Sequence, residues 1–368
     1  MEFLNKTRVW VAASLIFSLC LSCFAAAALL DIFVIEHESD EEISIESVDF
    51  GNQSGTLDLE GSKETTKKPS TNKNNKETST QKVTEATGSN SIIDSNASPN
   101  GDVLTEEEIA ALAKSISVTK QVGTYENDNV ALTVTEKVFK SGNDKTTYFV
   151  VDIRVSSAEY VKTALASGNK LTSNQTKTVA TMAKAQNAIL AINGDGCGQS
   201  ARSRGYVVRN GITYRSTAST SGDTEALVML GDGTMRIIDQ RTTSLNSIDN
   251  EWHVFSFGPA LINNGKISVT KNQEINGQSM DDNPRTSIGM VEPLHYVIIV
   301  GDGRTNNSKG LTLYQLAQAL AYEGCTVGYN LDGGGSTTLW FNGEVINYPT
   351  TNGRYNERAV SDIVYIEK

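Results

Sequence analysis

Three consecutive glycines follow an aspartate in the stretch YNLDGGGSTTLW, residues 329–340. An apolar run leads into Asp332, so a buried strand would deliver this carboxylate to the loop at its end. Glycine loses more backbone entropy on folding than any other residue. We therefore expect Gly333–Gly335 where the backbone turns sharply or exposes its N–H groups to a ligand. With the hydroxyl of Ser336 directly after it, the stretch predicts a site; the alternative is an aspartate that caps its own glycine turn.

Other charged and polar side chains stand near the ends of predicted strands, several of them beside glycines. They are Asn193 and Asp195 in AINGDGCG, Arg285 and Thr286 in NPRTSIGM, Asp302 and Arg304 in VGDGR, and Glu357, Arg358 and Asp362 in NERAVSDI. Arginine suits bidentate binding of a phosphate, and glycine N–H groups add donors. Carboxylates suit acid/base or nucleophilic work at a glycosidic carbon. Taken singly, each has an ordinary interpretation as turn chemistry or as a solvated charge; together they predict a phosphate- and sugar-directed site.

Several other chemistries are excluded by what the sequence lacks. It has three histidines, too few for a His-rich zinc site or a Ser-His-Asp triad to be probable alongside structural roles. Neither G-x-S-x-G nor a P-loop occurs. Cys197 and Cys325 form no CxxC pair, and whether they form a disulfide depends on a distance that sequence does not give. The formal net charge of -11 argues against nucleic acid as a partner.

The N-terminal third predicts attachment to a membrane. Residues 1–35 carry Lys6 and Arg8 ahead of an apolar run, and a bilayer crossing takes about 20 such residues. We expect a signal-anchor helix with the N-terminus in the cytoplasm and the remainder outside the cell. A cleaved signal peptide, with a secreted product, is the alternative. Residues 36–104 are rich in Ser, Thr, Asn and Lys and predict a disordered stalk, and residues 105–117 a short helix with a capping box.

Residues 118–368 have the composition of a single folded domain. Short alternating runs separated by Asn-Gly and Asp-Gly predict hairpins, as in YVVRNGITYR (206–215) and GPALINNGKI (258–267). Two segments have helical patterns, TKTVATMAKAQNA (176–188) and LYQLAQALAYEG (313–324). Strands outnumber helices, so we predict an α+β domain of mostly antiparallel strands and hairpins with two or more packed helices.

An ordered series of motifs over residues 180–368 resembles the phosphodiester glycosidase family. The series is AINGDG, GPALINNGK, PRTSIGM, VGDGR followed by SKGLTLYQLAQAL, YNLDGGGSTTLWFNG and ERAVSDIVYI. The resemblance implies hydrolysis of a sugar-1-phosphodiester between the anomeric carbon and the phosphate oxygen. It also implies a substrate among exopolysaccharides or cell-wall glycans, since many bacterial relatives are surface or secreted proteins. Gly196 and Cys197 stand where the family more often has an aromatic residue, which puts the substrate fit in doubt.

The residues and the resemblance together assign roles. Arg285, Arg304 or Arg358 would hold the phosphodiester, helped by the N–H groups of Gly333–Gly335 and the hydroxyls of Thr286 and Ser336. Asp195 or Asp332 would stabilise an oxocarbenium-like centre or activate water, with Asp302 as a third candidate carboxylate. Asn193 would hold a sugar hydroxyl. No cofactor is needed for this chemistry.

Two other classes of function stay open. The domain could bind surface polysaccharide without cleaving it. It could also be a metal-assisted phosphodiesterase that uses Asn193, Asp195, Asp302 and Asp332 as oxygen ligands for Ca²⁺ or Mg²⁺. EDTA and the identity of the products separate these classes, because a glycosidase releases free sugar and an intact phosphomonoester.

Overall fold

The computed structural model describes residues 103–172, 175–198, 205–220, 222–271, 274–275, 278–279 and 282–368. The expected signal-anchor (1–35) and nearly all of the expected stalk (36–104) lie outside the described residues. Among the described residues, no helix combines the length and the apolar composition that a membrane crossing requires.

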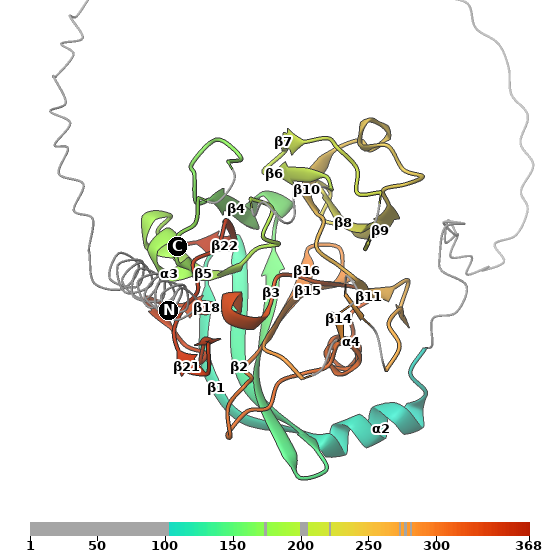
Figure 1. Ribbon diagram of the computed structural model, residues 1–368, viewed down its shortest axis with the longest axis vertical. Helices are drawn as coiled ribbons and strands as arrows, with labels where there is room; N and C mark the ends of the chain where they lie inside the picture. Colours follow the sequence, from blue (N-terminus) through green and yellow to red (C-terminus); the bar gives the residue numbers. More distant parts are fainter. Residues whose placement is uncertain are drawn as a thin grey trace, which may run out of the picture. The chain divides into compact units, whose positions relative to one another are not determined.

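An eight-stranded sheet forms the largest layer of the domain (Figure 1). Its order is β1-β2-β3-β16-β15-β17-β11-β12, and every pairing in it is antiparallel. The strands are β1 (Ile116–Glu126), β2 (Val130–Ser141), β3 (Asp144–Val155), β16 (His295–Gly301), β15 (Arg285–Glu292), β17 (Val327–Asn330), β11 (Ala260–Asn263) and β12 (Lys266–Ile267). Burial alternates along much of β2, whereas β16 is buried along its whole length.

Two five-stranded sheets and two small hairpins complete the β structure. The first sheet is β19 (Glu344–Val345), β18 (Leu339–Phe341), β5 (Ala188–Asn193), β22 (Asp362–Glu367) and β4 (Lys162–Leu165). The second is β7 (Ile212–Arg215), β6 (Val207–Arg209), β10 (Glu251–Phe255), β8 (Glu225–Leu230) and β9 (Met235–Asp239). The hairpins are β13 (Glu274–Ile275) with β14 (Gln278–Ser279), and β20 (Thr350–Thr351) with β21 (Arg354–Tyr355).

The expected Asn-Gly hairpin turns are present. Both residues of Asn210-Gly211, Asn264-Gly265 and Asn342-Gly343 have positive φ, as a type I′ turn requires. At Asp232-Gly233 only the glycine has positive φ. There the carboxylate of Asp232 instead accepts from the backbone N–H of Thr234, which closes a different turn.

Three α-helices occur among the described residues: α2 (Glu106–Ser115), α3 (Val179–Ala185) and α4 (Leu313–Tyr322). A capping box begins α2 at Thr105, as the sequence indicated, and a second one begins α4 at Thr312. Helix α2 is shorter than the predicted 105–117, because β1 begins at Ile116. The described domain is therefore α+β with strands predominating.

Helix α4 covers one face of the large sheet. Leu316 and Leu320 are fully buried, and a Cβ at Gly328 of β17 would lie 2.8 Å from the Cδ1 atom of Leu320. Only a residue without a side chain allows this close packing of helix on strand. The α4 face and the sheet belong to one large apolar core, to which Leu112 of α2 also contributes.

The antiparallel pairing brings three chain segments together at one end of the central strands of the large sheet. Gly301, the last residue of β16, pairs with Arg285, the first residue of β15. Asn330, the last residue of β17, pairs with Ser287 near the same end of β15. The residues that follow β16 and β17 therefore emerge beside the start of β15.

The loop that follows β5, in another sheet, lies at the same place. Asn193 is the last residue of β5, and the backbone N–H of Asp332 donates to the carbonyl of Gly194 over 3.3 Å. Loops that the sequence separates by more than a hundred residues thus meet where two sheets end.

Candidate active site

Asp332 begins a short turn that its own carboxylate holds together. Its Oδ1 atom accepts from the backbone N–H of Gly333 over 3.0 Å, and its Oδ2 atom accepts from the hydroxyl of Ser336 over 2.6 Å. The backbone of Gly334–Ser336 forms a single 3-10 turn in which Gly334 has a φ of 61°. Aspartate caps such turns readily, so the turn itself fixes the carboxylate at the end of β17.

The guanidinium of Arg358 completes a cluster with these two side chains. Its Nε and Nη2 atoms donate to the Ser336 hydroxyl over 3.0 and 2.7 Å, and Nη2 lies 3.3 Å from Oδ2 of Asp332. The Arg358 side chain is 44 % exposed, whereas that of Asp332 is 9 % exposed. A buried carboxylate, a buried hydroxyl and a solvent-accessible cation therefore meet in one place.

A second guanidinium lies against the glycine turn. A Cβ at Gly334 would lie 3.1 Å from Nη2 of Arg304, so the absence of a side chain makes room for the cation. Arg304 has the unusual φ of 60°, and its Nε and Nη2 atoms donate to Oδ1 of Asn283 over 3.0 and 2.9 Å. Positive φ in a non-glycine residue is strained and often marks functional sites. Arg304 and Arg358 thus both lie against the turn.

The backbone N–H groups of Gly333 and Gly334 have hydrogen-bond acceptors that the sequence did not predict. We expected those of Gly333–Gly335 to face a ligand. Instead, the N–H of Gly333 donates to Asp332, and that of Gly334 donates to the carbonyl of Pro284 over 2.8 Å. The reason is that the turn folds back on its own aspartate and against the start of β15. What the glycines supply is space for neighbouring side chains.

Arg285 lies deeper than the other two arginines. It is buried, and its Nε atom donates to the carbonyl of Leu311 over 3.0 Å. Burial and the nearby charge of Arg304 lower the pKa of Arg285 to about 10. The side chain therefore stays protonated at neutral pH and adds positive potential beneath the turn.

Asn193 and Thr286 connect the two sheets behind the turn. The Asn193 amide donates to the carbonyl of Asp332 over 2.5 Å, and its Oδ1 atom accepts from the hydroxyl of Thr286 over 2.8 Å. Both side chains are fully buried. We expected them to contact substrate; their hydrogen bonds are instead used to hold the backbone of Asp332, because a polar group buried between sheets must find protein partners.

Asp302 lies at the end of β16 and is 6 % exposed. Its Oδ1 atom accepts from the backbone N–H of Tyr348 over 2.8 Å and from the amide of Asn347 over 3.1 Å. Asn347 also donates to the carbonyl of Thr337, directly after the glycine turn. Within the described part of the chain no hydrogen bond engages Oδ2 of Asp302. Burial raises the pKa of this carboxyl to about 6.

Asp195 is held apart in a buried ion cluster with Arg209 and Asp362. The Nη2 atom of Arg209 lies 2.7 Å from Asp195 Oδ1 and 3.0 Å from Asp362 Oδ2, and all three side chains are at most 2 % exposed. Asp195 Oδ2 accepts from the backbone N–H of Ser256 over 2.9 Å. Both oxygens of this carboxylate are therefore occupied by protein donors.

Arg209 was missed by the sequence analysis. It stands in the run YVVRNG after two apolar residues of a predicted buried hairpin, and a charge in such a position was the available signal. Its guanidinium lies 4.3 Å from the centre of the Phe255 ring, which adds a cation–π contact to the two ion pairs.

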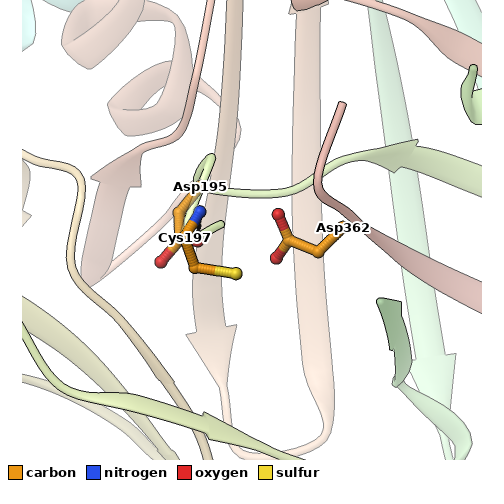
Figure 2. Close-up of side chains that lie close together, drawn as sticks. All are labelled: Asp195, Cys197 and Asp362. Carbon is orange, nitrogen blue, oxygen red and sulfur yellow. Dashed lines mark hydrogen bonds between the residues drawn. The ribbon is translucent and has the colours of Figure 1, made fainter. Parts of the chain in front are cut away.

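The ion cluster contains Asp195, one of the ligands that a metal-assisted phosphodiesterase would use. Asp195, Cys197 and Asp362 place potential ligand atoms within 4.8 Å of one another (Figure 2). Arg209 already supplies a cation to both carboxylates, and burial, with Asp362 and Asp195 nearby, raises the pKa of the Cys197 thiol well above its ordinary value. A cysteine binds a metal as the thiolate, and Cys197 is held as the thiol. These three side chains therefore fit a buried ion cluster with Arg209 better than a metal centre.

The two cysteines of the domain do not pair. Cys197 and Cys325 are both free and buried. Cys325 packs in the main apolar core, and Cys197 packs with Leu165 and Val207. The disulfide that the sequence left open is therefore absent.

Residues 186–367 match the sequence model of the phosphodiester glycosidase family. We identify residues 186–367 as a domain of the phosphodiester glycosidase family. The SPbeta prophage-derived uncharacterized protein YomE of Bacillus subtilis (strain 168) is 31% identical over 196 residues, which are 52% of this chain and 29% of that protein. N-acetylglucosamine-1-phosphodiester alpha-N-acetylglucosaminidase from Mus musculus is 28% identical over 123 residues, 29% of this chain and 24% of that protein.

A solved structure shows the same fold. The catalytic domain of the zebrafish N-acetylglucosamine-1-phosphodiester alpha-N-acetylglucosaminidase, auto-inhibited by its pro-peptide, superposes with a TM-score of 0.53. The two are 18% identical, and the match covers 69% of this chain and 88% of that one. The chain spans less than a third of the length of the curated relatives above.

Proposed function

We propose that this domain hydrolyses a sugar-1-phosphodiester by breaking the bond between the anomeric carbon and the phosphate oxygen. The observation that carries the proposal is the cluster of Asp332, Ser336 and Arg358 at the glycine turn, with the guanidinium of Arg304 against Gly334 of the same turn. Two guanidinium groups beside a carboxylate suit a substrate with an anionic diester next to a sugar carbon. Membership of the phosphodiester glycosidase family supports the same reaction.

The arginines bind the diester and stabilise the departing phosphate. Arg358 is partly exposed, and Arg304 lies at Gly334, so a phosphate between them would receive hydrogen bonds from both. Charge that develops on the leaving oxygen in the transition state would be neutralised by fixed cations. A phosphate monoester is already a good leaving group, so strong acid assistance is not required.

The carboxylates act at the anomeric carbon or hold the site in place. Asp332 Oδ2 lies 3.3 Å from Nη2 of Arg358 and accepts a hydrogen bond from Ser336. A phosphate that draws the guanidinium away would remove the cation from this oxygen, and Ser336 would continue to hold the carboxylate toward the anomeric carbon. Asp332 then stabilises the oxocarbenium-like centre or activates water. Asp302, whose Oδ2 atom accepts no hydrogen bond from the described residues, is the second carboxyl of the pair. Asp195 is a positioning residue, since Arg209 and Ser256 occupy both of its oxygens.

The proposed substrate is an exopolysaccharide or a cell-wall glycan, and the proposed location is the outer face of the cell membrane. These follow from the anchor and stalk expected in residues 1–104 and from the family resemblance. A secreted product after signal cleavage is the alternative arrangement. Either one places the hydrolase where surface polymers are found.

The test uses the full-length chain and a panel of α- and β-sugar-1-phosphodiesters, including UDP-N-acetylglucosamine, with and without EDTA. We expect free sugar and an intact phosphomonoester in mass spectrometry, at a rate that EDTA leaves unchanged. Asp332→Asn should abolish release, while the control Asp249→Asn, at an exposed position, should keep it. Sugar phosphate as product, or loss of activity in EDTA, would support a metal-assisted phosphodiesterase instead. No product from any substrate, together with binding to wall polymers, would support a binding module.

A further inference from the structure

Two exposed tyrosine rings lie together beside the candidate active site. Tyr348 is 48 % exposed and Tyr355 is 54 % exposed, and their ring centres are 5.0 Å apart with a tilt of 58°. Of the large apolar side chains exposed in the described residues, these are the two aromatic ones. Exposed tyrosines in mutual contact offer a rigid apolar surface at little cost in side-chain entropy.

Hydrogen bonds and close packing attach this pair to the catalytic residues. The backbone N–H of Tyr348 donates to Asp302 over 2.8 Å. A Cβ at Gly335 would lie 2.6 Å from Oγ1 of Thr351, so the hairpin β20–β21 packs directly on the glycine turn. Tyr355 ends this hairpin, and three residues later the backbone N–H of Arg358 donates to the carbonyl of Gly335 over 3.3 Å.

We propose that Tyr348 and Tyr355 form a subsite for a sugar ring on the leaving-group side of the substrate. The inference rests on the proposed function, because it takes the phosphate to lie between Arg304 and Arg358. Asp332 is buried, so the sugar that is cleaved must lie on the inner side of that phosphate. The tyrosines are exposed, and Tyr355 precedes Arg358 by three residues, so they lie where the rest of a glycan would extend toward solvent.

The chemistry of the pair fits a pyranose. The C–H faces of a sugar ring are apolar and pack on an aromatic face, while its hydroxyls stay in water or bond to a phenol oxygen. Because the rings are tilted by 58°, one ring can lie beneath the sugar while the other closes its side. The pair therefore favours a phosphodiester whose second ester carries a glycan over one that carries a small alkyl group.

The test compares two N-acetylglucosamine-1-phosphodiesters, one with a methyl group and one with a tetrasaccharide as the second ester. Affinity is measured by calorimetry in the full-length Asp332→Asn background, so the readout does not require turnover. We expect Tyr348→Ala/Tyr355→Ala to lower the preference for the tetrasaccharide ester about tenfold. Tyr348→Phe/Tyr355→Phe, which keeps both rings, should retain the preference. Ile212→Ala is the control, since it removes an exposed apolar side chain from β7.

The outcomes distinguish this inference from the proposed function. An unchanged preference in the double alanine variant overturns the tyrosine subsite, whether or not the wild-type chain is catalytic. If the double alanine variant loses the preference and the wild-type chain releases no sugar, the subsite is supported and the proposed hydrolase activity is overturned. An unfolding midpoint equal to that of the wild type shows that the double variant is folded, as the exposure of both rings leads us to expect.

Discussion

Asp302 is a buried carboxyl whose ionisation opposes folding. Burial raises its pKa to about 6, above the value of about 4 in an unfolded chain. The folded state therefore binds this proton more tightly, and the stabilisation that results is complete below about pH 4 and is lost as the pH rises through about 6.

Asp302→Asn should remove this pH dependence. We compare the free energy of unfolding of the variant with that of the wild type at each pH. The difference, variant minus wild type, should rise by about 2–3 kcal/mol between pH 4 and 7 and then level off. Urea unfolding at each pH measures it. Asp249→Asn, at an exposed carboxylate, should show a constant difference over the same range. A constant difference for Asp302→Asn as well would contradict the assignment of a raised pKa.

Arg358 should be intolerant of lysine. Its Nε and Nη2 atoms both bind the Ser336 hydroxyl, a two-point contact that a single ammonium cannot reproduce. We expect Arg358→Lys to lower kcat/KM about 100-fold. The midpoint of thermal unfolding should change little, because the side chain is 44 % exposed. Arg354→Lys, on the neighbouring strand β21, should keep full activity, and equal losses in the two variants would refute the special role of Arg358.

At the scale of elements, the glycine turn and the hairpin β20–β21 pack as one unit. A methyl group at residue 335 would lie 2.6 Å from the Thr351 side chain, so one of the two elements must move. Gly335→Ala should therefore destabilise the protein by about 1–3 kcal/mol. Thr351→Ala removes the colliding oxygen and should recover part of that loss, giving a coupling of at least about 0.5 kcal/mol in a double-mutant cycle. Strict additivity of the two substitutions would show that the elements are not in contact.

The elements that the sequence revealed best were those with strong local signals. Asn-Gly turns and capping boxes are local chemistry, so hairpins such as β6–β7 and helix α4 could be predicted with nearly correct ends. Strands β20 and β21 have two residues each, too short for an alternating pattern to emerge. The aromatic pair at the site was missed for that reason.

The site was predictable in composition but not in its contacts. Asp332, Ser336, Arg304 and Arg358 were expected near one another because each stands near the end of a predicted strand, the first three of them beside glycine. Which oxygen each donor would reach depends on how two sheets meet, and sequence does not give that. Asp195 illustrates the limit, since its partner Arg209 comes from a different sheet.

At the scale of the whole domain, one buried ion cluster joins the two five-stranded sheets. Arg209 ends β6 in one of them, and Asp362 begins β22 in the other. A Cβ at Gly194 would lie 2.2 Å from Oδ2 of Asp362, so the loop that contains Gly194 packs tightly against the cluster. Since the carbonyl of Gly194 also accepts from the N–H of Asp332, the cluster supports the candidate active site from behind.

Two of the three charged residues of this cluster, Asp362 and Arg209, should differ in their effect on stability. Burial, reinforced by Asp195, raises the pKa of Asp362, so its negative charge is already disfavoured. Asp362→Asn keeps the shape and leaves Arg209 paired with Asp195, and should cost less than about 2 kcal/mol. Arg209→Met leaves two buried carboxylates without their cation and should cost about 3–5 kcal/mol.

Urea unfolding at pH 7 measures both variants of the cluster. The control Arg236→Met, at an exposed position on β9, should change the free energy of unfolding by less than about 0.5 kcal/mol. Equal losses for Arg209→Met and Asp362→Asn would mean that packing rather than charge joins the sheets. A larger loss for Arg209→Met, reduced when Asp195→Asn and Asp362→Asn are added to it, would show that one buried cation holds the two sheets together behind Asp332.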